Sequence, residues 1–241
     1  LFTMKTIVIT GDSWGCGEWQ RATEPPGTQQ QIISHPGLTQ YFIDDGYNVA
    51  NLSQYSMGNH TLIDPLYYFL DVNRHLNIKH VFFIQTDITR SIRDKFFDFN
   101  KFSKDKNNNL EQIIRYMYYD VYSKLNHIGN VLGYNITLIG GLSDLVIDVG
   151  EFNHLNFLVP SWVKLLDESA KISHLLDHVN MEHLLAVYND KAQLLPFIEE
   201  LNVRHDIWKN NPNFFWPDGN HPNRIGHKVL YDYIKNSKLL D

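Results

Sequence analysis

The sequence predicts an α/β protein with a doubly wound parallel sheet, and two patterns indicate this class. Short runs rich in β-branched and aromatic residues recur without polar alternation, as in strands covered on both faces. They are residues 5–10, 47–52, 80–85 and 135–140. Segments with helical spacing lie between them, at roughly 36–45, 61–76 and 110–132. Each is long enough to cross between parallel strands, which is typical of a layered α/β fold whose ligands bind beyond the carboxyl ends of the strands.

Two stretches depart from this alternation. Residues 91–109 mix aromatic and charged residues and end in an asparagine run, which predicts a long loop. Residues 151–215 are richer in helix formers than in strand formers, so we expect helices that pack on the sheet or cap a site. Because no repeat or Pro/Gly/Ser linker divides the chain, residues 1–241 are expected to form one domain, with insertions or lid segments at 91–109 and 151–215.

The last segment reads "WPDGNHPN" followed by "RIGHKVLYDYIKN". Pro222 suits the start of a helix, because its missing N–H is not needed there. The residues expected on one apolar face of this helix are Ile225, Val229, Leu230 and Tyr233. Asp218 and His221 would then lie on the turn that enters the terminal helix.

Composition narrows the possible functions. The chain is 43% hydrophobic and 20% charged, which is typical of a globular protein with a sizeable core. It carries 21 Lys and Arg against 27 Asp and Glu without a basic block, which disfavours a nucleic-acid surface. Its single cysteine cannot form an internal disulfide. We see neither a signal peptide in "LFTMKTIVIT" nor an 18-residue apolar stretch, so we expect a cytoplasmic protein without a membrane span.

"GDSWG", at residues 11–15, follows the first predicted strand. A serine hydroxyl is a poor nucleophile and needs a base that is itself oriented by a third group. Asp218 and His221 are three residues apart, a spacing at which a carboxylate can hold the imidazole Nδ1–H while Nε2 faces a hydroxyl. A serine after Gly-Asp at the end of a strand is, taken alone, more typical of a helix N-cap or a turn, so the distant Asp/His pair is what indicates catalysis by Ser13.

"GDSWG" together with "DGNHPNRIGH" resembles the SGNH or GDSL-type hydrolases, which begin with a GDS serine block and end with a D-x-x-H-P-N block. The resemblance extends from Gly11 to His227. It implies a three-layer α/β/α fold of the flavodoxin-like type, with a central parallel sheet of about five strands. It also implies that Ser13 is the nucleophile, His221 the general base and Asp218 the residue that orients it.

The second block of the family supplies a backbone N–H to the oxyanion hole, together with the N–H of the nucleophile, here Ser13. In this chain "NLSQYSMGNH" follows the second predicted strand. Counting from Asn51, the usual glycine position falls at Ser56, and Gly58 comes two residues later. Spacing favours Ser56 as the donor, whereas residue type favours Gly58.

The third block of the family reads G-x-N-D, and its Asn side chain donates to the oxyanion. This chain has "FFIQTDITR" instead, with Thr86 or Asp87 at the turn. An ionised Asp87 would repel an oxyanion, and loss of one donor typically costs about 2.7 to 4 kcal/mol of transition-state stabilisation. Three possibilities remain open: Thr86 replaces the missing Asn as oxyanion donor, Asn59 donates to the oxyanion from the neighbouring loop, or the enzyme is slow.

The sequence contains other residues that could react or bind a ligand in place of Ser13. Cys16 is a competing nucleophile, because a thiol near a helix N-terminus can have a lowered pKa, although a buried small hydrophobe is the preferred interpretation. His174 and His178 are spaced i, i+4, but they lack the H-E-x-x-H pattern and are interpreted as a polar helix face. Asp12 is expected to hold the turn.

The sequence therefore predicts a serine hydrolase that cleaves an acyl or acetyl ester of a carbohydrate or lipid through an acyl-Ser13 intermediate. Its partner would be that small-molecule or glycan ester, and the scheme needs no metal or organic cofactor. The alternative is a noncatalytic module on the same fold that binds carbohydrate through aromatic loops such as residues 96–99 and 213–216.

Overall fold

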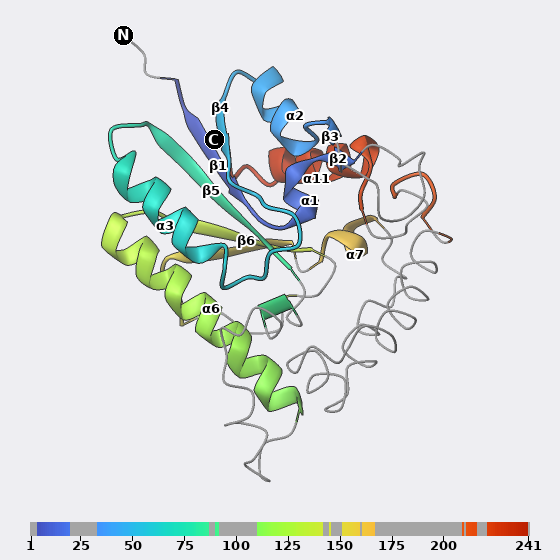
Figure 1. The fold of residues 1–241 in the computed structure, drawn as a ribbon. Coiled ribbons are helices and arrows are strands. Elements are labelled where there is room, and N and C mark those ends of the chain that lie inside the picture. Colours follow the sequence, from blue (N-terminus) through green and yellow to red (C-terminus); the bar gives the residue numbers. More distant parts are fainter. Residues whose placement is uncertain are drawn as a thin grey trace.

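The computed structural model has a five-stranded parallel sheet at its centre (Figure 1). It describes residues 4–19, 33–86, 90–91, 110–141, 145, 151–159, 161–166, 209, 211–215 and 221–240. The strands, in their order across the sheet, are β4 (Asn48–Asn51), β1 (Thr6–Thr10), β5 (Ile78–Gln85), β6 (Ile136–Gly140) and β7 (Leu155–Val159). The chain leaves β1 for β4 and then crosses back to β5, so the strand order reverses between β1 and β5. In a flavodoxin-like sheet this is where a binding site forms.

Helices cover both faces of the sheet (Figure 1). The α3–α6 face is covered by α3 (Ile63–Val72) and α6 (Leu110–Leu132). The α2–α11 face is covered by α2 (Leu38–Asp44), α7 (Trp162–Leu166) and α11 (Arg224–Asn236). A short helix, α1 (Ser13–Cys16), follows β1, and β2 (Glu18–Trp19) pairs with β3 (Ile33–His35) in a small antiparallel sheet. The predicted three-layer α/β/α fold is confirmed.

The strands are apolar throughout because alternate side chains enter different cores. In β1, Val8 packs on the α3–α6 face, while Ile7 and Ile9 pack on the α2–α11 face. In β5, Phe83 and Phe82 divide in the same way. A strand buried on both faces lacks polar alternation, which explains the runs seen in the sequence.

The fifth strand lies where the sequence analysis expected helices. Leu155–Val159 forms β7 at the edge of the sheet, within the stretch 151–215. Only Leu155 and Val159 are buried in this strand, so its apolar signal is weaker than that of the central strands. Most of the remaining stretch, and residues 92–109, lie outside the described residues, so the insertion or lid segments stay predictions.

The terminal helix buries a different face from the one expected. It begins at Arg224, and Asn223 caps it by accepting the backbone N–H groups of Ile225 and Gly226. The buried residues are Gly226, His227, Leu230, Tyr231 and Ile234. Leu230 is buried as predicted, but Ile225 and Tyr233 are 52% and 40% exposed, so the prediction was wrong for these two residues. Polar side chains occupy the inner face because they find partners there, as the hydroxyl of Tyr231 does in donating to Asp45.

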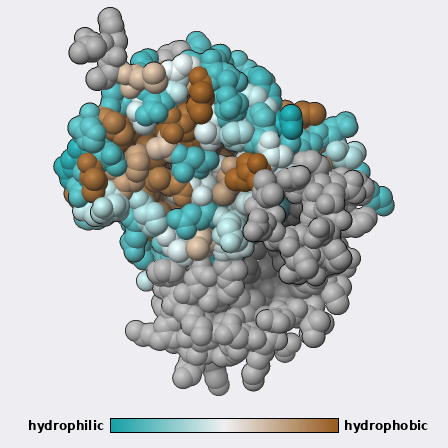
Figure 2. Space-filling model, turned by 45° about the horizontal axis from the view of Figure 1, so that its top comes forward, coloured by the Kyte–Doolittle hydropathy of each residue, from teal (hydrophilic) through white to brown (hydrophobic). Residues whose placement is uncertain are grey.

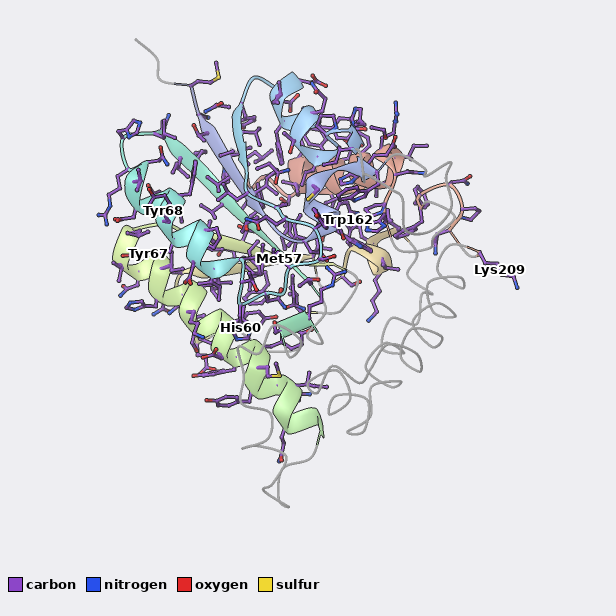
Figure 3. The ribbon with its side chains drawn as sticks, viewed as in Figure 1. Met57, His60, Tyr67, Tyr68, Trp162 and Lys209 are labelled. Atoms are coloured by element: carbon purple, nitrogen blue, oxygen red, sulfur yellow. The ribbon has the colours of Figure 1, made fainter. Side chains whose placement is uncertain are left out.

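Exposed hydrophobic residues lie among hydrophilic ones on the face seen in Figure 2. Tyr67 and Tyr68 project from α3 and are 42% and 70% exposed (Figure 3). Scattered exposed hydrophobic residues are ordinary in soluble folds and need no special explanation. Among the residues that the structure describes, no helix combines the length and the apolar character needed to cross a membrane.

Candidate active site

The Ser13 turn begins directly after β1. Asp12 is the N-cap of α1, and its Oδ1 accepts the backbone N–H of Trp14 at 2.9 Å. Ser13 is only 4% exposed, and its Oγ makes no hydrogen bond to any described residue, His221 included. Buried hydroxyl groups normally have partners, so an unbonded one at the strand-order reversal marks this turn as a candidate site.

Asp12 holds the turn, as the sequence predicted. It also joins the turn to the end of β5, which the sequence did not predict. Its Oδ2 accepts hydrogen bonds from Thr86 Oγ1 at 2.6 Å and from Arg90 Nη1 at 2.7 Å. The side chains of Asp12 and Arg90 are 6% and 18% exposed, so the ion pair is largely buried. The single hydroxyl hydrogen of Thr86 is donated to Asp12 here.

The loop after β4 is bound to the Ser13 turn. Asn51, at the end of β4, donates its Nδ2 to the carbonyl oxygen of Gly15 at 2.8 Å. The backbone N–H of Gln54 donates to the carbonyl oxygen of Gly11 at 2.9 Å. These bonds fix the first part of the loop beside the predicted nucleophile.

Three of the predicted oxyanion donors, Ser56, Gly58 and Asn59, lie along this loop, which also carries Met57 and His60 (Figure 3). Ser56 has a φ of +61°, a left-handed conformation that favours glycine. Gly58 is buried. Asn59 is buried as well and is bound to Thr86 at two points, donating Nδ2 to its carbonyl oxygen at 2.9 Å and accepting its N–H at 2.8 Å.

Trp19 lies between His221 and the Ser13 turn and contacts both. The indole N–H of Trp19 donates to the carbonyl oxygen of Ser13 at 3.0 Å. The ring centroids of Trp19 and His221 are 5.8 Å apart. One side chain thus contacts both predicted catalytic segments, which lie about 200 residues apart in the sequence. Asp218 and Asp87 lie outside the described residues, as do His174 and His178.

Cys16 has the opposite electrostatics from a reactive thiol. Burial, followed by the nearby charge of Asp12, raises its pKa to about 12. Its Sγ also donates to the carbonyl oxygen of Asp12 at 3.4 Å. A thiol in this state stays protonated at neutral pH and is a weak nucleophile.

Several contacts of the site were not found from the sequence. Arg90 neutralises Asp12, and Glu18 pairs with Arg224 at 2.8 Å, next to the His221 turn. His227 is fully buried on the inner face of α11, where its Nδ1 accepts the N–H of Leu38 at 3.3 Å. Burial lowers the pKa of His227 to about 4. The only local signal was Glu18 itself, a charged residue inside the "GDSWGCGEW" stretch.

No group of three or more His, Cys, Asp and Glu side chains that could hold a metal ion occurs among the described residues. The contacts described above bring hydroxyl, imidazole, carboxylate and guanidinium groups to the site, together with backbone N–H groups. These are the groups that acyl transfer uses.

Comparisons with known proteins gave similarity to solved structures only. No protein-family model and no curated protein sequence matches the chain. A psychrotrophic esterase, EstA, from Pseudoalteromonas sp. is 11% identical over 96% of this chain and 97% of that one, with a TM-score of 0.43. An acetyl xylan esterase from Geobacillus stearothermophilus is 14% identical over 97% and 94%, with a TM-score of 0.41. A member of the lipolytic G-D-S-L family from Veillonella parvula is 14% identical over 97% and 98%, with a TM-score of 0.38.

Proposed function

We propose that the chain is a serine hydrolase of the SGNH type that cleaves an ester through an acyl-Ser13 intermediate. The observation that carries the proposal is the place of Ser13, at the carboxyl end of β1 where the strand order reverses. Its hydroxyl is buried and has no hydrogen-bond partner among the residues that the structure describes. Trp19 connects this serine to the segment that carries His221. The two end motifs of the sequence thus meet through one side chain.

In the proposed reaction, Ser13 Oγ attacks the acyl carbonyl carbon while His221 takes the hydroxyl proton. The tetrahedral intermediate then expels the alcohol, to which His221 returns that proton. In the second half, water attacks the acyl-Ser13 ester while His221 takes a proton from it. The acyl–Oγ bond then breaks, His221 returns the proton to Ser13 Oγ, and the carboxylic acid leaves. Asp218 has the role of fixing the tautomer of His221.

The oxyanion is assigned to backbone N–H groups of Ser13 and of Ser56 or Gly58. The positive φ of Ser56 supports it as the counterpart of the usual glycine. Thr86 gives its hydroxyl hydrogen to Asp12 and is therefore assigned to holding the turn. Both polar atoms of the Asn59 side-chain amide are bound to the backbone of Thr86. Asn59 is therefore assigned to fixing the loop against the end of β5. With no Asn in the third block, we expect a slow enzyme.

The test is a panel of short-chain acyl esters and sugar acetates, which also addresses the substrate class. We expect the wild-type protein to hydrolyse members of this panel, and Ser13→Ala and His221→Ala to lower kcat by about 1000-fold or more. The matched control is Ser53→Ala, because Ser53 Oγ is another buried hydroxyl without a partner among the described residues. Unchanged hydrolysis in Ser13→Ala would reject the proposal, and sugar binding without turnover would favour the carbohydrate-binding alternative.

A further inference from the structure

The geometry points to Glu18 as a positioning residue that holds the His221 turn in register with Ser13. This inference rests on the proposed function. Glu18 and Trp19 make up β2, which begins five residues after Ser13. Trp19 binds the segment that carries Ser13, and Glu18 binds Arg224, just after the segment that carries His221.

Glu18 is a buried carboxylate with an unusually complete set of partners. Its side chain is 5% exposed, and it accepts the backbone N–H of Arg224 together with Arg224 Nη2 at 2.8 Å and Nε at 3.1 Å. Ser34 Oγ donates to Oε1 at 3.0 Å. Burial raises the pKa of a carboxyl group, but the hydrogen bonds from Arg224 and Ser34 outweigh it and lower the pKa of Glu18. Glu18 is therefore ionised at neutral pH.

Arg224 is the first residue of α11 and follows His221 by three positions. The first N–H groups of a helix have no partner within the helix. Asn223 accepts those of Ile225 and Gly226, and Glu18 accepts that of Arg224. A negative charge at this end is also favoured by the helix dipole. The chain directly after the His221 turn is thus fixed by Glu18, from β2.

Trp19 supplies the other half of the connection. It donates its indole N–H to the Ser13 carbonyl oxygen, and its ring lies against His221. A serine and its histidine base must lie within hydrogen-bond reach to react, and a displacement of about 1 Å can cost about 100-fold in rate. The β2 dipeptide is therefore placed to set the distance between the two catalytic residues.

Asp45 offers a matched control on the same helix. It binds Tyr231 and Lys235, the latter at 2.7 Å, and so ties the C-terminal half of α11 to the end of α2. Both carboxylates anchor α11 by side-chain hydrogen bonds and an ion pair, but only Glu18 does so next to His221. A merely structural role predicts similar results for the two positions.

The experiment compares Glu18→Gln with Asp45→Asn in three measurements. These are kcat and KM for ester hydrolysis, the rate of covalent reaction with an organophosphonate, and the NMR resonances of the Trp19 indole N–H and the His221 ring. We expect Glu18→Gln to lower kcat and the phosphonate rate by about 10- to 100-fold with KM within about twofold. It should also shift both resonances. Asp45→Asn should leave all of these unchanged, although both variants lower Tm.

The outcomes separate this inference from the proposed function. Wild-type activity with equal effects of the two substitutions would overturn the positioning role and leave the hydrolase intact. A wild-type protein inert to esters and phosphonate would reject the hydrolase, while shifted Trp19 and His221 resonances in Glu18→Gln alone would still support the positioning role. Should Glu18→Gln not fold, Arg224→Lys replaces it, because the Arg224 side chain is 55% exposed and the change removes only the two-pronged pairing. The same shifts and the same loss of kcat are then expected, and their absence would overturn the inference.

Discussion

Both faces of the sheet are buried, but their buried side chains differ in what they bind. The α3–α6 face is packed mainly from aliphatic and aromatic side chains, with Tyr122 donating to Gln85 as a buried polar pair. On the α2–α11 face, buried polar groups bind segments of the site, as Trp162 Nε1 does in donating to the Gly226 carbonyl oxygen at 3.1 Å. Figure 3 shows Trp162 close to the short helix that carries Ser13. The contrast indicates that the second face stabilises the fold and also holds segments of the candidate site through buried polar groups.

The largest effect is expected from a cavity on the α3–α6 face. Phe83 is fully buried there, so Phe83→Ala should lower the free energy of unfolding by about 3 to 5 kcal/mol. The reaction rate of the folded protein with an organophosphonate should stay unchanged, because the Phe83 side chain packs on the α3–α6 face, whereas Trp14, next to Ser13, packs on the α2–α11 face. Denaturant unfolding and labelling kinetics measure the two quantities. A loss of labelling that exceeds the unfolded fraction would show that the two faces are not separable.

A somewhat smaller loss of stability, joined to a loss of reactivity, is expected at the turn. Asp12→Asn leaves the guanidinium of Arg90 largely buried without its counter-charge, which should cost about 3 kcal/mol. Ser13 should also react more slowly, because the turn loses its connection to β5. The control is Asp71→Asn, whose exposed ion pair with Arg74 should contribute less than about 1 kcal/mol. Equal stability and equal reactivity in the two variants would contradict the role assigned to Asp12.

The smallest effect concerns pH. The pKa of His227 is about 4 in the folded protein against 6.5 for a free histidine, so protons bind the unfolded chain more readily. The stability that neutral His227 contributes is therefore present above pH 6.5 and is lost as the pH falls toward 4. We expect His227→Leu to reduce the acid-induced loss of unfolding free energy by about 2 kcal/mol.

Unfolding curves at pH 7 and pH 4.5 measure this difference. Burial also lowers the pKa of His80 to about 4, so part of the pH dependence should remain in His227→Leu and disappear further in a double variant with His80→Gln. Exposed His75 supplies the control substitution. A pH dependence identical in the wild type and His227→Leu would contradict the neutral, buried state of this histidine.

Much of the fold was predictable because the central strands are buried on both faces. Their apolar runs identified β1, β4, β5 and β6, and the crossover helices followed from their spacing. The edge strand β7 was missed because only its two end residues are buried, so no clear period remains. The inner face of α11 was assigned wrongly because His227 and Tyr231 are polar, and their partners could not be known from a helical pattern.

The candidate site likewise contains residues that the sequence could predict and residues that it could not. Ser13 and His221 stand in recognisable sequence motifs, and Ser56 was a candidate from its spacing after Asn51. Glu18 and Arg90 could not be assigned because each finds its ionic partner far along the chain, 206 and 78 residues away. Local sequence patterns carry no information about such pairs, and only the folded arrangement reveals them.

Ser13 is proposed as the nucleophile, and the residue that reacts with a covalent label tests this proposal. The protein is treated with an organophosphonate, digested, and the modified residue is located by mass spectrometry. The proposed mechanism predicts one adduct on Ser13, formed far more slowly in His221→Ala and absent in Ser13→Ala. An adduct on Cys16 or Ser53, or none on the folded wild-type protein, would contradict it.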